Sequence, residues 1–222
     1  MESSSSSLEL EYSQIERDHK PRRYNSPERV DRAQATGREI LRAAERLFAS
    51  DGYASVTMKD IAHEAGVAPA TVYLHFARKG SIVQALARAI TDDPDLSVEQ
   101  VEGVASVREQ IRLGVSILRR LNERSWVVAE ILRMHAGADP ELQLLREDWQ
   151  RRHIDAVTRG VAAVAHSGQL RSALTAEEAA DILYAVAGTD VYRALVRERG
   201  WSPSAYESWL ARFIDDHLMA RS

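Results

Sequence analysis

Apolar residues recur every three or four positions along most of this chain, the spacing that gathers them on one face of an α-helix. The first such stretch runs from 37 to 50, with these apolar positions: Ile40, Leu41, Ala44, Leu47 and Phe48. Two shorter stretches follow at 57–76 and at about 81–90. No stretch of convincing length alternates apolar and polar residues as a half-buried β-strand would. The pattern therefore predicts an all-α protein.

The second half of the chain repeats the helical pattern between clusters that contain glycine and proline. These clusters fall at 137–140, 166–169 and 200–203, where they end one helix and precede the next. Thr175 and Glu178 have the spacing of a capping box, which starts a helix. Together the signals predict five helices, with approximate bounds 97–121, 123–136, 140–167, 175–198 and 203–219.

The stretch from 57 to 76, TMKDIAHEAGVAPATVYLHF, predicts two short helices joined by a glycine turn. Thr57 and Asp60 have capping-box spacing, and Gly66 tolerates the left-handed conformation of a tight reversal. Pro69 suits the first turn of the second helix, where its missing N–H costs nothing. Two short helices in this arrangement are typical of a helix-turn-helix, which lays its second helix in the DNA major groove. The same residues would also suit two ordinary helices of an α-helical core.

Three regions follow from these patterns. Residues 1–27 hold a run of five serines and few apolar residues, a composition that predicts a disordered extension. Residues 28–90 contain the first periodic stretches, and we expect them to form a three-helix domain around the helix-turn-helix. The break TDDPD at 91–95 opens the remaining segment, and we predict that residues 91–222 form a second all-helical domain.

Composition limits the chemistry available to the protein. The chain has 222 residues and no cysteine, which excludes disulfides, cysteine-ligated zinc and thiol redox sensing. No apolar run approaches the ~20 residues that span a membrane. The first twenty residues also lack the apolar centre of a signal peptide. We therefore expect a cytoplasmic protein with no membrane partner.

Charge is distributed unevenly along the chain. The net charge is −4, which by itself would argue against nucleic acid. However, residues 20–80 carry 11 Lys and Arg against 7 Asp and Glu, whereas the segments before and after them are each acidic. DNA affinity depends on local neutralisation of phosphates, so the positive segment favours DNA binding by the helix-turn-helix.

Three runs inside residues 36–86 carry a more specific signal: ILRAAERLFASDGY, TMKDIAHEAGV and TVYLHFARK. In this order and spacing they closely resemble the N-terminal domain of the TetR family of bacterial transcriptional regulators. Ala68 and Gly80 depart from the family pattern, which commonly has serine and an acidic residue there. The resemblance implies a helix-turn-helix DNA-binding domain followed by a helical domain for effector binding and dimerisation. It also implies a ligand-responsive repressor that binds a pseudo-palindromic operator as a dimer and associates with the bacterial nucleoid when DNA-bound.

The matched motif indicates which side chains face DNA. Those expected to face the major groove are Pro69, Ala70, Thr71, Tyr73, Leu74 and His75. Those expected to approach phosphates are Thr57, Met58, Lys59 and Lys79. Tyr73 can offer a hydroxyl to phosphate, and His75 can reach phosphate or a base edge. The second helix has no Arg, Asn or Gln, so bidentate contacts to guanine or adenine cannot come from it. Specificity would come from Thr71, thymine methyl groups and DNA shape.

An arginine-rich segment precedes the helix-turn-helix, with Arg22, Arg23, Arg29, Arg32 and Arg38. One hypothesis is that it forms an arm that reaches phosphates or a minor groove, as arms do in other helix-turn-helix proteins. The alternative is a basic tail that is simply solvated.

The resemblance also implies a homodimer through the last two long helices, about 175–198 and 203–219, and a small-molecule effector of unknown identity. Side chains aromatic or polarisable enough to line an effector cavity are Trp126, Met134, His135, Trp149, His153 and Tyr184. Each of these would equally suit ordinary core or surface.

The sequence does not favour an enzyme. The motifs GxSxG, GxGxxG and the Walker loop are absent, and His63-Glu64 lacks the second histidine of a zinc protease motif. Separated triad residues would leave no such motif, but nothing selects a set of them. No metal site or cofactor is expected. The alternatives that stay open are a transcriptional activator of the same family and a non-specific architectural DNA-binding protein.

Overall fold

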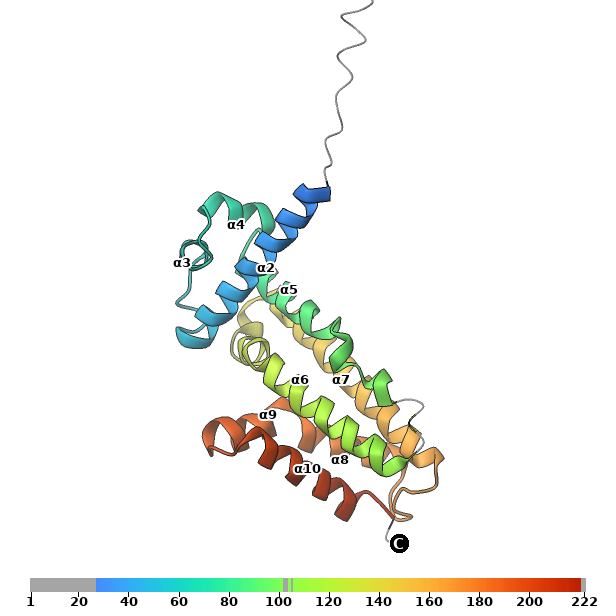
Figure 1. Ribbon diagram of the computed structural model, residues 1–222. Helices are drawn as coiled ribbons and strands as arrows, with labels where there is room; N and C mark the ends of the chain where they lie inside the picture. The colour runs from blue at the N-terminus through green and yellow to red at the C-terminus, as the bar shows by residue number, and fades with distance from the viewer. Residues whose placement is uncertain (1–26, 102–103, 105, 221–222) are drawn as a thin grey trace, which may run out of the picture. The chain divides into compact units, whose positions relative to one another are not determined.

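A computed structural model describes residues 27–101, 104 and 106–220 (Figure 1). Within these residues every regular element is helical, apart from one isolated bridge between Leu170 and Met219. The predicted all-α fold is therefore confirmed. The predicted disordered extension, residues 1–27, lies outside the described residues except for Pro27. No helix in the described part of the chain is both long and apolar enough to cross a membrane.

The helices fall into a short N-terminal series and a longer second series. The first series is α2 (Pro27–Ser50), α3 (Met58–Glu64), α4 (Pro69–His75) and α5 (Lys79–Thr91). The second series is η1 (Pro94–Leu96), η2 (Val98–Val101), α6 (Val107–His135), η3 (Ala136–Ala138), α7 (Pro140–His166), α8 (Ala176–Ala187), α9 (Thr189–Tyr192), the π-helical turn η4 (Arg193–Glu198) and α10 (Pro203–His217). Residues from Ile40 onward form one unit, and the packing described below lies within it.

Helix boundaries in the second series differ from the prediction at three places. The predicted helices 97–121 and 123–136 are one helix, α6, which begins only at Val107. Asn122 does not end a helix. Its buried amide instead donates a 3.0 Å hydrogen bond to the carbonyl of Ala187. The predicted helix 175–198 is interrupted at Gly188, where the backbone is extended.

One hydrophobic core joins the first helices to the middle of the chain. It contains Phe48, Ile61 and Val72 together with Leu132 of α6 and Leu142 of α7. The short helices α3 and α4 therefore pack on the same core as the ends of α6 and α7. A shift of those ends of α6 and α7 would displace α3 and α4, because close-packed interiors transmit displacement.

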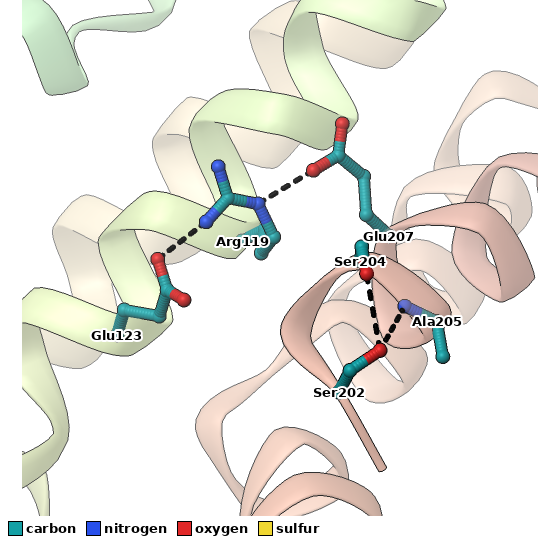
Figure 2. Close-up of polar contacts among 6 residues, drawn as sticks. All are labelled: Arg119, Glu123, Ser202, Ser204, Ala205 and Glu207. Atoms are coloured by element: carbon teal, nitrogen blue, oxygen red, sulfur yellow. Dashed lines mark hydrogen bonds and ion pairs between the residues drawn. The ribbon is translucent and has the colours of Figure 1, made fainter.

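A second core fills the bundle of α6, α7, α8 and α10. Tyr206, Leu210 and Ile214 of α10 point into it and are buried. Figure 2 shows the polar contacts at the edge of this bundle, where Arg119 of α6 donates to Glu207 of α10 at 2.5 Å and also contacts Glu123. In the same view, Ser202 caps α10 by accepting from the backbone N–H of Ala205 at 3.1 Å. The contact between Arg119 and Glu207 holds α10 against α6.

Candidate functional site

Local hydrogen bonds fix the start of α3, and a glycine ends it. The Thr57 hydroxyl accepts from the backbone N–H of Asp60 at 3.2 Å, and the Asp60 carboxylate accepts from the Thr57 N–H at 2.8 Å. This is the predicted capping box. Hydrogen bonds from the Thr57 hydroxyl and then from its N–H lower the pKa of Asp60. At the other end of α3, Gly66 has φ of +66°, as the tight reversal requires.

Helix α4 is anchored on one side and exposed on the other. Val72 is fully buried, whereas the side chains of Tyr73 and Leu74 are 55% and 84% exposed. Pro69 is at the start of the helix, and Ala68 provides no side-chain cap. Pro69 and Ala70 are also exposed, while Thr71 and His75 are half-buried. A helix anchored by one apolar residue and exposing the next two can enter a groove without unfolding any core.

The side chains predicted to approach phosphate differ in their freedom to do so. Lys59 is exposed, and Thr57 is exposed with its hydroxyl already bonded to Asp60. The Met58 side chain is buried in the core, so only its backbone can face a phosphate. Lys79 donates to the carbonyl of Tyr53 at 2.6 Å and lies over the Tyr53 ring at 4.5 Å. Partial burial there lowers the pKa of Lys79, and a phosphate contact would require its ammonium group to leave this position.

The contacts of Tyr53 connect the helix-turn-helix to the second helical series. Its ring lies 5.1 Å from the ring of His135, at the end of α6. Nearby, Arg78 before α5 forms an ion pair with Glu141 at the start of α7. His135 thus belongs to this junction, and it does not line either of the two cavities described next.

The first cavity, of about 370 Å³, lies between α6, α7 and the α8–η4 segment. The structure brings together four of the six predicted effector residues around it: Trp126, Trp149, His153 and Tyr184. Met134 is instead 58% exposed and, like His135, lies outside the lining. Burial lowers the pKa of His153, whose ring lies 5.1 Å from that of Tyr184. We call this space the α6–α7–α9 cavity.

Sequence reasoning missed two arginines of its wall, Arg146 and Arg193. Arginines on amphipathic helices are usually solvated, so their residue type gave no signal. It also missed the second cavity, of about 390 Å³, between α6, α7, α8 and α10, with Gly114 and Gly160 in its mostly apolar lining. Glycine inside a long helix costs stability and was the one available clue. We call this space the apolar cavity.

Known proteins are similar to this chain in sequence and in fold. Residues 40–86 match the sequence profile described as "Bacterial regulatory proteins, tetR family". The chain is 31% identical over 164 residues to the HTH-type transcriptional regulator TtgR of Pseudomonas putida, covering 70% of this chain and 78% of that protein. It is 30% identical over 179 residues to the HTH-type transcriptional repressor BepR of Brucella suis, covering 76% and 85%. A solved transcriptional regulator from Saccharomonospora viridis, in complex with choline, aligns with a TM-score of 0.70 and 26% identity, covering 85% of this chain and 100% of that one.

The relatives agree with the sequence prediction in two respects. They are regulators of transcription and not enzymes. Their similarity extends well beyond the helix-turn-helix into the second helical series, since most of both chains is covered. The chain therefore belongs to the TetR family of bacterial transcriptional regulators.

Proposed function

We propose that the protein is a ligand-responsive repressor that binds a pseudo-palindromic operator as a homodimer. The observation that carries the proposal is α4, which is anchored by Val72 and presents Tyr73 and Leu74 to solvent. A two-fold dimer would place two such helices in successive major grooves, roughly 34 Å apart. We propose residues 28–90 as the DNA-binding domain and residues 91–222 as the effector and dimerisation domain.

The contacts proposed for α4 follow from its exposure. Pro69, Ala70, Tyr73 and Leu74 face the groove, with Thr71 and His75 at the edges of that surface. Lys59 approaches a phosphate at the start of α3, together with Thr57 and the backbone N–H of Met58. Without a bidentate base contact from α4, sequence preference rests on thymine methyl contacts and DNA shape.

The arginine-rich arm stays a proposal. Arg22 and Arg23 lie outside the described residues, as does the side chain of Arg29, whereas Arg38 is exposed on α2. An arm on phosphates would steepen the salt dependence of binding, because each phosphate contact releases counterions. Deleting residues 1–26 should therefore weaken operator binding and reduce the salt slope. Unchanged values would show a merely solvated tail.

The dimer is proposed through α8 and α10. Trp209, Phe213 and His217 are spaced four apart along α10, with Trp209 and Phe213 half-buried and His217 exposed. The row continues to Trp201, which is 38% exposed and contacts Trp209 edge-on. Partly exposed aromatic rows of this kind are typical of protein interfaces.

Repression is proposed over activation because BepR, which matches most of this chain, is named a repressor. Activation is the second candidate, since the sign of regulation depends on where the operator lies relative to a promoter. A reporter gene placed behind the selected operator distinguishes the two by whether the protein lowers or raises expression.

Selection of bound sequences from a random DNA pool tests the proposal. Wild-type protein should enrich one palindrome, and a Tyr73→Ala/Leu74→Ala variant should lose that enrichment. Both side chains are exposed, so the variant should keep the wild-type melting temperature. Asp155→Ala, an exposed change on α7 outside the proposed groove surface and interface helices, serves as the matched control and should enrich the same palindrome. A wild-type protein that binds every sequence equally would instead indicate an architectural DNA-binding protein.

A further inference from the structure

The α6–α7–α9 cavity differs from an ordinary apolar cavity in the chemistry of its wall. Arg146, His153 and Arg193 all line it, and in each a buried side-chain nitrogen has no hydrogen-bond partner among the described residues. The atoms are the Nε of both arginines and the Nε2 of the histidine. Buried polar atoms are nearly always satisfied, so three such nitrogens at one cavity call for an explanation.

The charges around the cavity do not cancel at Arg146. Arg133 is paired with Glu130 at 2.6 Å, and Arg193 contacts both Asp190 and Glu198. Within the described part of the chain, Arg146 has no carboxylate partner. A half-buried guanidinium without a counter-charge is a favourable position for an anion, and its planar fork suits a carboxylate in particular.

The wall also carries three aromatic side chains and two carboxylates, Glu130 and Asp190, which pair with Arg133 and Arg193 respectively. The aromatic side chains are Trp126, Trp149 and Tyr184, and the guanidinium of Arg197 lies over the Trp126 ring, 4.8 Å from its centroid. Flat apolar walls with a few polar groups at one place are typical of small-molecule sites, and about 370 Å³ lies within their usual range. The apolar cavity, by contrast, offers one unpartnered oxygen, that of Gln110, and no comparable set of donors.

We infer that the α6–α7–α9 cavity binds an aromatic carboxylate, with its ring between the tryptophans and its carboxylate on Arg146. His153 Nε2 supplies a further hydrogen-bond position, as donor or acceptor according to its tautomer. Leu132 and Trp149 both line the cavity and pack in the core that holds α3 and α4. A ligand pressing on them is therefore positioned to act on the helix-turn-helix, and this second step rests on the proposed function.

Isothermal titration calorimetry with matched probes tests the binding step without DNA. The probes are 2-naphthoate, neutral 2-naphthamide and cationic 2-naphthylmethylammonium, which share one aromatic body. The carboxylate should bind at least roughly tenfold more tightly than the amide, the difference expected for a charge-assisted contact. Equal binding of all three, or no binding of the carboxylate at millimolar concentration, overturns the inference.

Two variants locate the site. Arg146→Gln should weaken binding of the carboxylate roughly tenfold and leave that of the amide unchanged. Arg120→Gln is the matched control, because Arg120 is also a half-buried arginine with an unpartnered Nε but lines neither cavity. If Arg146→Gln folds poorly, Arg146→Lys replaces it in the test. This variant keeps the positive charge without the planar guanidinium and should bind the carboxylate with intermediate affinity. Equal losses from the glutamine variants at 120 and 146 would show a general effect of net charge and contradict the assignment.

The effect on DNA is measured separately, with the selected operator and the same protein preparations. Release of operator by 2-naphthoate from wild type, but not from Arg146→Gln, supports the effector role. Binding of the carboxylate without release leaves the site in place and removes the effector role. Failure to bind any operator would count against the proposed function, while the calorimetry would still decide the anion site.

Discussion

At the residue scale, glycine has opposite roles at two positions in this chain. Gly66 ends α3 with φ of +66°, whereas Gly160 lies inside α7 with a helical backbone. A Cβ added at either position would meet nothing within 4 Å. The two sites therefore differ in backbone conformation and not in space, which makes them a matched pair.

Substituting alanine at each position should change stability in opposite directions. Gly66→Ala should lower the free energy of unfolding by about 1–2 kcal/mol, because a side chain disfavours the left-handed conformation. Gly160→Ala should raise it by about 0.5–1 kcal/mol, because alanine is the better residue inside a helix. Urea unfolding of both variants measures the difference. A loss of stability in Gly160→Ala would mean that a side chain at this position of the apolar cavity disturbs the packing around it.

Two lysines near the DNA-binding surface form a second matched pair. Lys59 is exposed at the start of α3, whereas the ammonium of Lys79 is held by Tyr53. Lys59→Ala should weaken operator binding uniformly across sequences and reduce the salt slope by about one, as loss of a phosphate contact does. Lys79→Ala should lower the melting temperature and leave the slope unchanged. The measurement is operator affinity as a function of salt concentration. A reduced salt slope in Lys79→Ala would show that Lys79 contacts a phosphate, as the sequence predicted.

At the scale of elements, the capping boxes were predictable from sequence because they are local. Thr57 with Asp60 and Thr175 with Glu178 both form as their three-residue spacing predicted. The continuity of α6 through Asn122 was not predictable, because the partner of that amide is the carbonyl of Ala187, 65 residues away. The same holds for the α6–α7–α9 cavity. Aromatic residue type indicated Trp126 as a lining residue, whereas only the tertiary structure brings Arg146 to the same cavity.

The two boxes also predict a shared pH dependence. Hydrogen bonds from threonine lower the folded-state pKa of Asp60 and of Glu178 below their ordinary values of 3.8 and 4.5. A carboxylate with a lowered folded pKa stabilises the fold above its unfolded pKa, and this contribution is lost as pH falls through the folded pKa. Thermal unfolding of wild type and an Asp60→Ala/Glu178→Ala variant should differ at neutral pH and converge below about pH 4. A difference that persists undiminished at pH 2 would rule out the ionised carboxylates as its source.

At the scale of the whole molecule, the two cores have different roles in the proposed switch. One core holds the short helices together with Leu132 and Trp149 of the cavity wall, and the other holds α10 against α6 and α8. The effector cavity contacts both cores, since its Tyr184 packs against the second, whereas the interface proposed on α10 belongs to the second core alone. Because most of α10's large apolar residues are committed to the second core, the surface left for a partner is the aromatic row that includes Trp209 and Phe213.

A charge in the aromatic row of α10 should convert the proposed dimer to a monomer. Phe213→Asp places a charge in the centre of the proposed interface and should shift the protein from dimer to monomer in sedimentation velocity. Operator affinity should fall at least roughly a hundredfold, because two linked half-sites are replaced by one. Ser204→Asp adds the same charge on the opposite side of α10, because nine residues at about 100° each place it about 180° from Phe213, and this variant should remain dimeric. A Phe213→Asp dimer with unchanged operator affinity would place the interface elsewhere on the surface, since the buried face of α10 is already filled by Tyr206, Leu210 and Ile214.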